Sequence, residues 1–442
     1  MKLLKVDTIE EVMAKLKAYF ASADDTGTGE PGTSEEIPLY EAEGRYLAEE
    51  IYAAEDAPAF TRSVVDGYAV QARDTFGVSD SMPVFFSLAG EMEMGASRVT
   101  LTGPAAQEAE AFVLRQGQAV YVPTGGMLPA GADAVVMVEF VEKLDEHTIS
   151  VYKAVAPGSG LMERGADFSA GQRIYERGHR ITVKDVGMLA VMGRGFVPVF
   201  ARPRVSVIST GDEIVSVFED PAPGQVRDVN SYTLAALVAG TGAEVERVAL
   251  VRDDRQALEL AFQEALNRSD IVLLSGGSSA GTKDMTAEII NSAGRPGVIT
   301  HGIAMKPGKP TIVGVLREEK CCCQSRPKLA VGLPGHPMAA IIAYRVVVDA
   351  FIRKYYFRNE SPETVITARL AENIHAGEGR ETFIFVKLRR TEEAGESVWA
   401  AEPIHAKSAS LSQLRYADGY VRLSHLAEGA AAGTPAEVTL LI

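Results

Sequence analysis

Two glycine-rich loops and one lysine-bearing loop fall close together in the sequence and could jointly bind an anion. S-G-G-S-S-A-G (275–281) and G-L-P-G-H-P (332–337) each follow a short apolar run. Glycines let a ligand approach the backbone closely, and the free amides at the start of a helix attract anions. K-P-G-K-P (306–310) carries Lys306 and Lys309 on a loop that two prolines stiffen. Residues 270–337 therefore predict a pocket for an anionic ligand.

Five carboxylates form a second group of candidates at the predicted ends of strands or starts of helices: Asp212, Glu213, Asp228, Asp253 and Asp284. Each has an ordinary explanation by itself, because Asp commonly caps helices. As a set they could meet at one sheet edge, where paired carboxylates bind Mg²⁺ while the ion keeps several waters. We therefore expect at least one of them to act in metal binding or proton transfer.

Other chemistries have weaker support. The 275–281 loop matches neither the G-x-x-x-x-G-K-[ST] phosphate loop nor the G-x-G-x-x-G dinucleotide turn. His301 and His336 flank the anion loops, but a lone histidine is more often structural than a general base. Cys321–Cys323 are consecutive, and neighbours on an extended chain point to opposite sides, so they make a poor metal cage. We interpret their segment as a polar hairpin loop.

The elements that must position these loops alternate between strands and helices from Arg204 onward. The pattern predicts a strand ending at Thr210, a helix capped by Asn230 or Ser231, a strand at 245–251, a second helix and a strand at 271–274. Such alternation implies a parallel sheet with right-handed crossovers. The apolar runs 271–274, 311–315 and 329–331 are expected to be buried strands of that sheet, with the ligand outside the carboxyl ends of the strands.

Three further regions flank this predicted domain. Residues Thr8–Phe20 have helical apolar spacing, with a capping box formed by Thr8 and Glu11. Residues 53–171 have short alternating runs and Gly-Pro turns, which indicate an inserted β-rich module. Two of its loops, 61–70 and 122–129, are candidates for function, although ordinary hairpin turns are the favoured explanation from the residues alone. Residues 365–442 predict a small β-barrel or sandwich.

Composition limits the class of protein. The 442 residues exceed the usual size of one core, so two to four domains are expected. A net charge of −15 disfavours nonspecific nucleic-acid binding, which depends on Lys and Arg neutralising phosphates. Apolar stretches are too short for a membrane span, and acids enter the N-terminal segment too early for a signal peptide. These features predict a cytoplasmic protein.

The motifs, taken in order, resemble the molybdopterin molybdenumtransferase family, called MoeA in bacteria and the gephyrin E domain in eukaryotes. The matching segments are S-V-V-D-G-Y-A-V, P-T-G-G-x-L-P-x-G-A-D-A-V-V, S-T-G-D-E-I, D-V-N-S, V-R-D-D, S-G-G-S-S-A-G-T-K-D, K-P-G-K-P and G-L-P-G-H-P, between residues 6 and 440. Each is weak alone, but the ordered set is specific. The family inserts molybdate into adenylated molybdopterin during molybdenum-cofactor biosynthesis.

The resemblance implies a multidomain α/β fold. An N-terminal helix (1–26) would pack with a parallel-sheet molybdopterin-binding domain (200–356), and a C-terminal β-barrel would cover 357–442. A small connecting domain (37–52 and 172–199) would carry the inserted β-rich lobe (53–171). Family members are homodimers whose active site lies between subunits, so Asp66 and Thr124 would act on the site of the partner.

The resemblance also implies roles for individual residues. Catalytic carboxylates would be Asp66, Asp167, Glu213, Asp253 and Asp284, of which Glu213, Asp253 and Asp284 would bind Mg²⁺. Adenylated molybdopterin and molybdate, as substrates, would contact Thr124, Ser275, Gly276, Gly277, Ser278, Ser279, Gly281, Lys306, Lys309, Pro334, Gly335, Arg380 and Ser408. The molybdopterin-adenylylating enzyme and apo-molybdoenzymes would be partners.

Two departures from the family pattern leave alternatives open. His336 and Ala339 stand where the family usually has Asn and Ser, and Gln413 stands where a second Ser is common. A tungstate-specific insertase and a non-catalytic carrier of molybdopterin or its cofactor are therefore retained as alternatives. The adenylylation step itself is disfavoured, because that enzyme resembles only the sheet domain.

Overall fold

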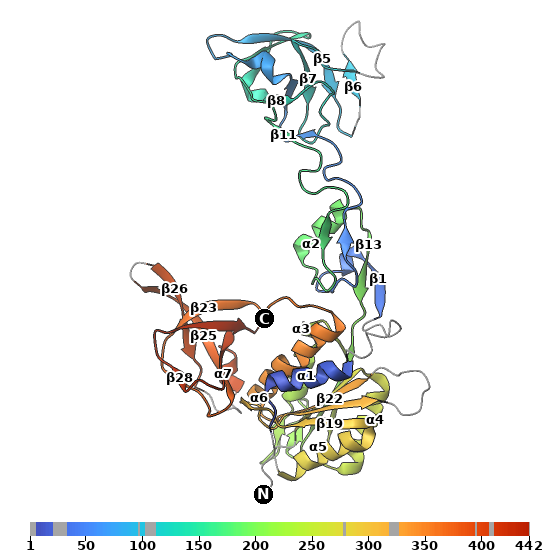
Figure 1. Cartoon of the computed structure of the whole chain (residues 1–442), viewed down its shortest axis with the longest axis vertical. Coiled ribbons are helices and arrows are strands. Elements are labelled where there is room, and N and C mark those ends of the chain that lie inside the picture. Colours follow the sequence, from blue (N-terminus) through green and yellow to red (C-terminus); the bar gives the residue numbers. More distant parts are fainter. Residues whose placement is uncertain are drawn as a thin grey trace. The chain divides into compact units, whose positions relative to one another are not determined.

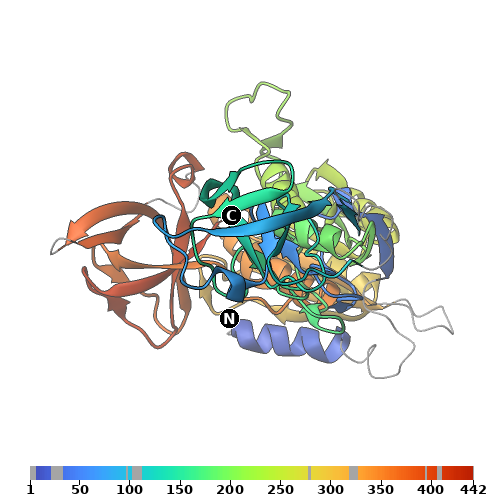
Figure 2. The ribbon, with the colours of Figure 1, turned by 90° about the horizontal axis from the view of Figure 1, so that it is seen from above.

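The computed structural model describes residues 6–20, 33–95, 98–101, 112–276, 280–317, 327–393, 396–405 and 411–441, with the backbone alone at 280–284, 393 and 396. The chain divides into two compact units (Figures 1 and 2). Unit 1 comprises Met1–Glu49, Arg177–Thr182 and Phe196–Ile442, and unit 2 comprises Glu50–Glu176 and Val183–Gly195. In the described part of the chain, no helix is both long and apolar enough to span a membrane.

A six-stranded sheet forms the centre of unit 1, in the order β17-β14-β18-β22-β21-β19. The strands are β17 (Glu244–Val251), β14 (Arg204–Thr210), β18 (Ile271–Gly276), β22 (Lys328–Leu333), β21 (Ile312–Arg317) and β19 (Arg295–His301). The first four run parallel, as the alternation of strands and helices predicts.

The prediction that the 311–315 run belongs to a parallel sheet is wrong. β21 pairs antiparallel with β22 and with β19, so it alone runs against the other five strands. Only residues 318–327 connect β21 to β22, and a parallel connection needs a crossover of a dozen or more residues. The reversal places the start of β21 at the same edge as the carboxyl ends of its neighbours, since Ile312 pairs with Gly332.

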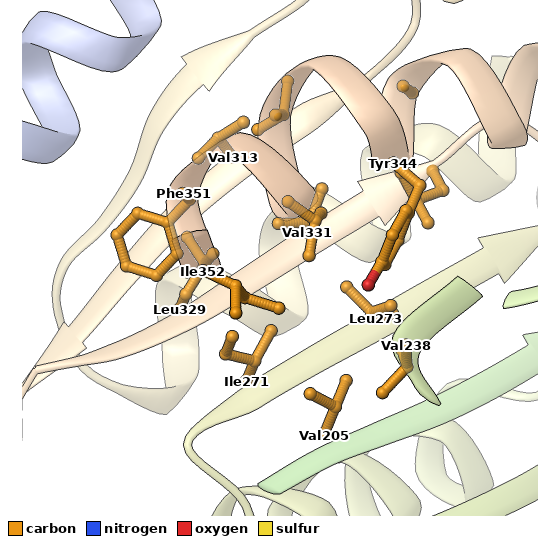
Figure 3. Packing of buried hydrophobic residues seen from close by; sticks show 14 of the residues in the cluster. Val205, Val238, Ile271, Leu273, Val313, Leu329, Val331, Tyr344, Phe351 and Ile352 are labelled. Carbon is orange, nitrogen blue, oxygen red and sulfur yellow. The ribbon is translucent and has the colours of Figure 1, made fainter. Parts of the chain in front are cut away.

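Helices cover both faces of this sheet, so its four central strands, β14, β18, β22 and β21, are buried on both sides. One face packs on α1 (Ile9–Phe20), α3 (Asn230–Thr241), α6 (Pro337–Ala343) and the π-helical turns Tyr344–Asp349 and Ile352–Tyr356 that follow it. Figure 3 shows alternate strand residues such as Val205, Leu273 and Val331 beneath Tyr344 and Phe351. The other face packs on α4 (Arg255–Arg268) and α5 (Ala280–Ala293).

Two carboxylates, Asp254 and Asp228, have a structural role because they accept hydrogen bonds from amides at the starts of helices. Asp254 caps α4 by accepting a hydrogen bond of 2.8 Å from the Ala257 amide. At α3 the prediction that Asn230 or Ser231 is the cap is wrong, because Asp228 accepts from the Ser231 amide at 3.1 Å. Asn230 is thus the first helical residue and its side chain makes other contacts.

The C-terminal region of unit 1 is a closed five-stranded β-barrel, as predicted. Its strands follow one another around the ring as β25 (Glu381–Glu393), β26 (Glu396–Pro403), β23 (Val365–Leu370), β29 (Pro435–Leu440) and β27 (Gly419–Leu423), which pairs again with β25. The short strand β20 (Met305–Lys306) pairs with the start of β25 and links the K-P-G-K-P loop to the barrel. Smaller elements are α7 (Leu411–Leu414) and the pair β24 (Ile374–His375) and β28 (Gly429–Ala430).

Two further strand pairs complete unit 1. β1 (Ser34–Pro38) pairs antiparallel with β13 (Phe196–Phe200). β15 (Ile214–Val215) and β16 (Val226–Arg227) pair beside the carboxyl end of β14. The predicted capping box of α1 is present, because the Thr8 amide donates to Glu11 and the Glu11 amide donates to Thr8 Oγ1.

Unit 2 is β-rich, with a main sheet in the order β8-β4-β7-β5-β10-β9 and β6 paired to β5. The strands are β4 (Gly67–Val70), β5 (Val84–Met92), β6 (Val99–Leu101), β7 (Gln118–Val122), β8 (Ala134–Met137), β9 (Val141–Lys143) and β10 (Thr148–Val151). Two apolar clusters fill its interior. The pairs β2 (Ile51–Tyr52) with β12 (Arg173–Tyr175) and β3 (Arg62–Ser63) with β11 (Leu161–Met162), and helix α2 (Val183–Val191), complete it.

Candidate functional site

A cavity of about 140 Å³ lies at the carboxyl edge of the unit 1 sheet. Its walls come from the ends of β14, β18 and β22, from the start of β21 and from α5. The lining residues are Thr210, Leu274, Gly276, Thr286, Pro310, Ile312, Gly332, Leu333, Pro334, Gly335 and His336. All three loops that the sequence singled out therefore contribute to one cavity, at the edge where open α/β sheets bind ligands.

Glycine is required at the start of the first loop. Gly276 has a φ of +143°, and a Cβ atom there would lie 2.0 Å from the Thr210 carbonyl oxygen. The predicted contacts Gly277, Ser278 and Ser279 lie outside the described residues. Gly281 lies in α5, as does Asp284, whose side chain is not described.

Acidic side chains gather beside the cavity at the ends of β14 and β17. Asp253 Oδ1 accepts a 2.6 Å hydrogen bond from the hydroxyl of Thr210, which lines the cavity. The Asp253 amide donates to Asp212 Oδ1 at 3.3 Å, so these two residues are neighbours. Glu213 is exposed, and its carboxylate lies against Gly211. We call Asp212, Glu213 and Asp253 the acidic edge.

The acidic edge offers oxygen donors that suit Mg²⁺. Three or more His, Cys, Asp or Glu side chains do not come together as a metal cage within the described residues. Mg²⁺ is usually held by one or two carboxylates together with substrate phosphates and waters, so the pair Asp212 and Asp253 fits that mode of binding. The predicted set of Glu213, Asp253 and Asp284 stays a prediction.

Basic side chains lie on the opposite side of the cavity. Lys306 and Lys309 are exposed, and Lys309 directly precedes Pro310 in the cavity wall. The turn that carries Arg380 lies beside Lys306, because a Cβ atom on Gly377 would be 3.2 Å from Lys306 Cδ. We call Lys306, Lys309 and Arg380 the basic rim. Among the described residues, salt bridges to these three cations are absent.

Asn230 is a residue whose connecting role the sequence reasoning missed. Its Nδ2 donates to Ser275 Oγ and to the Gly335 carbonyl oxygen, both at 2.8 Å. Ser275 is fully buried, so its predicted contact with the ligand cannot be made through an exposed hydroxyl. In the sequence, the D-V-N-S segment predicted a helix cap and contributed to the family resemblance, but neither observation assigned a role to the side chain of Asn230.

Thr210, Thr286 and His336 are further lining residues that the predicted site set omits. Thr210 ends a strand in the quoted S-T-G-D-E segment, where the spacing does not distinguish its hydroxyl from that of a structural threonine. Ala339, the other departure from the family pattern, is buried in α6 and is not in the cavity wall. Ser408 and Cys321–Cys323 lie outside the described residues.

The two candidate loops of unit 2 meet each other. Asp66 Oδ1 accepts from the Thr124 amide at 2.7 Å and from the Thr124 hydroxyl at 3.1 Å. Both residues are exposed. Reciprocal backbone bonds between Ser63 and residues 125–126 hold the two loops together. The structure thus joins two segments that are 58 residues apart in sequence.

Asp167 occupies a different turn of unit 2. It is exposed, and its amide donates to the Ala57 carbonyl at 2.9 Å. Asp56 fixes the neighbouring backbone by accepting from the Ala170 amide and from Arg164. These bonds, the Ala170 amide first and the Arg164 guanidinium next, hold the pKa of Asp56 below its usual range. No described contact joins Asp167 to Asp66 or Thr124.

Comparison with known proteins identifies relatives along the whole chain. Family models match in order: "MoeA N-terminal region (domain I and II)" at 7–193, "Probable molybdopterin binding domain" at 206–354 and "MoeA C-terminal region (domain IV)" at 367–441. A molybdopterin molybdenumtransferase of Nostoc sp. is 31% identical over 356 residues, covering 80% of this chain and 77% of that protein. One from Bacillus subtilis is 29% identical over 415 residues, covering 93% and 90%.

A solved structure shows the same fold. The crystal structure of a molybdopterin biosynthesis moeA protein from Pyrococcus horikoshii OT3 has a TM-score of 0.75 and 28% identity, and the match covers 99% of this chain and 100% of that one. The matched regions include every loop that builds the cavity, the acidic edge and the basic rim. The chain therefore belongs to the MoeA family.

Proposed function

We propose that this protein is a molybdopterin molybdenumtransferase that uses adenylated molybdopterin and molybdate as substrates. Relatives of that name share most of its length. The observation that carries the proposal is the cavity itself, because glycine-rich backbone, a basic rim and an acidic edge meet at one end of one sheet. A phosphate-bearing pterin and a tetrahedral oxyanion both need such donors and positive charge.

The chain's own groups divide the work. Backbone amides at the start of α5 would bind the phosphates of the pterin substrate, where the wall at Gly276 and Gly335 has no side chain. The basic rim would attract molybdate and lower the cost of bringing a dianion next to phosphate. The hydroxyl of Thr210 holds Asp253 in place, so that carboxylate would accept a proton from, or orient, the attacking water.

The proposed reaction is balanced without a redox step. Water adds across the phosphoanhydride bond, which breaks to give AMP and the terminal phosphate of molybdopterin. Two dithiolene sulfurs bind molybdenum, and one oxygen of molybdate leaves as water with the two thiol protons. Mg²⁺ at the acidic edge would supply positive charge to the anhydride oxygens. Residues Asp212 and Asp253 would hold it together with the substrate phosphates.

The test is AMP release by purified protein given adenylated molybdopterin, Mg²⁺ and either molybdate or tungstate. Release should depend on the oxyanion and on Mg²⁺, and should fall by at least about a hundredfold in Asp253→Asn, as expected for loss of a proton-transfer group. It should also fall in Asp284→Ala, which would remove a predicted Mg²⁺ ligand. Asp254→Asn is the matched control, because that neighbour caps α4 and Asn caps equally well. Tight binding without AMP release would instead identify a carrier, and release with tungstate alone would identify a tungstate-specific insertase.

The basic rim has its own control. Lys309→Gln should weaken binding of molybdate about tenfold, whereas Lys354→Gln removes the same charge from an exposed site on a distant helix and should leave binding unchanged. Equal effects of the two substitutions would show that overall charge, and not the rim, attracts the oxyanion. Enzymes that make adenylated molybdopterin and apo-enzymes that accept the finished cofactor are the partners that this reaction requires.

A further inference from the structure

The D-V-N-S segment crosses the ends of three neighbouring strands. Ser209 of β14 pairs with Ser275 of β18, which pairs with Leu333 of β22. Asp228 Oδ1 accepts from the Ser209 hydroxyl at 3.2 Å. Two residues later, Asn230 binds Ser275 at 2.8 Å and the carbonyl of Gly335, two residues beyond Leu333, at 2.8 Å. One short segment therefore fixes the carboxyl ends of β14, β18 and β22 relative to one another.

These contacts lie on the face of the sheet that is opposite the cavity. Successive residues of a strand point to opposite faces. Leu274, Gly276 and Gly332 line the cavity on the α5 side, whereas Val207 and Leu273 pack in the other core with α3 and α6. By the same alternation, the side chains of Ser209 and Ser275 point to the face of the sheet that carries this second core. Asn230 is 6% exposed and is not part of the cavity wall.

Asn230 is nevertheless connected to two walls of the cavity. Ser275 directly precedes Gly276, and Gly335 lies between Pro334 and His336, all of which line it. A side chain that donates to both Ser275 and Gly335 sets the distance between the end of β18 and the residues that follow β22. Because backbone amides bind a ligand only when their spacing is fixed, this distance governs how well the cavity holds a phosphate.

We propose that Asn230 is a positioning residue that sets the affinity of the cavity for the phosphate-bearing part of the substrate. The inference rests on the function proposed above, since it takes adenylated molybdopterin as the ligand. Among the described residues Asn230 Oδ1 has no hydrogen-bond donor, so Nδ2 makes the contacts by which Asn230 connects the end of β18 to Gly335. A carboxylate at this position would keep the size of the side chain but would bring an oxygen against the Gly335 carbonyl.

A second asparagine in the same unit provides a matched control. Asn359 is 9% exposed, and its Nδ2 donates to the Gly178 carbonyl at 2.8 Å and to Ser361 Oγ at 3.3 Å. Asn359→Ala therefore removes the same kind of bridge, from one amide to a carbonyl and a serine hydroxyl. None of its three residues lines the cavity. A general loss of stability would affect both asparagine variants alike.

The experiment measures the Kd of adenylated molybdopterin and the melting temperature for the full-length wild type and for Asn230→Ala, Asn230→Asp and Asn359→Ala. Both Asn230 variants should raise Kd about tenfold or more, the effect expected when a buried hydrogen-bonded bridge is lost. In turnover, KM should rise by a larger factor than kcat falls. Asn359→Ala should lower the melting temperature similarly while Kd stays within about twofold of the wild type.

The outcomes separate this inference from the proposed function. If the wild type binds the substrate and the Asn230 variants keep its Kd, or match the Asn359 control, the positioning role is overturned. If the wild type fails to bind adenylated molybdopterin, the proposed function is overturned, and inorganic phosphate serves as the second probe for Asn230. A wild type that binds neither probe overturns both. Asn230→Asp supplies the comparison if the alanine variant does not fold.

Discussion

At the scale of single residues, the site depends on the absence of a side chain at Gly276 and on the hydroxyl of Thr210. A side chain at position 276 would collide with the carbonyl oxygen of Thr210, and glycine avoids this collision. Thr210 in turn lines the cavity and binds Asp253. Thr210 therefore contacts both Gly276 in the cavity wall and Asp253 in the acidic edge.

Gly276→Ala should lower the stability of the protein by distorting the backbone at the edge of the cavity. The new Cβ atom would lie 2.0 Å from backbone, and φ is +143°, so we expect a loss of about 3 kcal/mol or more. Gly240→Ala is the control, because among the described residues no atom beyond its chain neighbours and the backbone of its own helix α3 lies within 4 Å of the corresponding Cβ. It should stabilise the protein by about 0.5 kcal/mol. Urea unfolding measures both, and equal effects would contradict the steric account.

Thr210→Val should separate binding from catalysis. Valine keeps the volume but removes the hydroxyl that donates to Asp253 at 2.6 Å. A hydrogen bond to a charged group contributes about 1.5–3 kcal/mol, so kcat should fall about tenfold or more with little change in molybdate binding. Thr210→Ser keeps the donor and should restore the rate. If the serine variant is as slow as the valine variant, loss of the hydroxyl is not the cause of the lower kcat.

Asp56 allows a test by pH in unit 2. Because its folded pKa is depressed, its stabilisation is fully present above the ordinary carboxyl pKa of about 3.9 and is lost as pH falls through the lower folded value. The difference in unfolding midpoint between the wild type and Asp56→Asn should therefore be constant from pH 7 to 5 and shrink below about pH 4. A difference that grows towards low pH would show the opposite sign of coupling.

At the scale of elements, the direction of β21 decides whether the site forms. In a wholly parallel sheet the K-P-G-K-P loop, which precedes its strand, would lie at the amino edge, remote from the other loops. Because β21 is reversed, Pro310 and Ile312 line the same cavity as Gly276 and Gly335. The basic rim consequently faces the ligand loops instead of the far edge of the sheet.

Local patterns were sufficient for much of this architecture. The strand-helix alternation predicted the four parallel strands, and the apolar spacing of Thr8–Phe20 predicted α1. The direction of β21 could not be predicted from its own residues, because an apolar run has the same composition in either orientation. Asn230 was missed for a related reason, since its partners Ser275 and Gly335 are 45 and 105 residues away. Contacts of that length follow from the fold and not from spacing.

The loop that carries the lysines should be sensitive to its central glycine. Gly308 has a φ of +115°, and a Cβ atom would lie 2.4 Å from Met305 Cε. Gly308→Ala should cost about 1–3 kcal/mol and weaken molybdate binding as much as Lys309→Gln does, because both lysines would be displaced. Calorimetric titration with molybdate measures the second effect. Unchanged binding would mean that the lysines act without a fixed loop.

At the scale of the whole molecule, the candidate residues are divided between two compact units. Unit 1 contains the cavity, the acidic edge and the basic rim, whereas Asp66, Thr124 and Asp167 belong to unit 2. A homodimer in which each subunit supplies unit 2 residues to the other remains a proposal, and it can be tested by mixing subunits.

In this proposal, Asp66→Ala removes a catalytic carboxylate from unit 2, and Asp253→Asn removes one from unit 1. Co-expressed with different tags, the two variants should recover about a quarter of wild-type activity, since half of randomly formed dimers are mixed and each has one intact site. Each variant alone should stay inactive. Mixed dimers without activity would show that both residues of a site belong to one chain.

The antiparallel pairing of β21 with β22 has a practical consequence for labelling. The ends of the strands that flank residues 318–327, Arg317 and Lys328, lie at the amino edge of the sheet, about 20 Å of strand away from the cavity. A dye attached at either of these two positions would therefore lie at the far side of the domain, where it would not occupy the ligand's place.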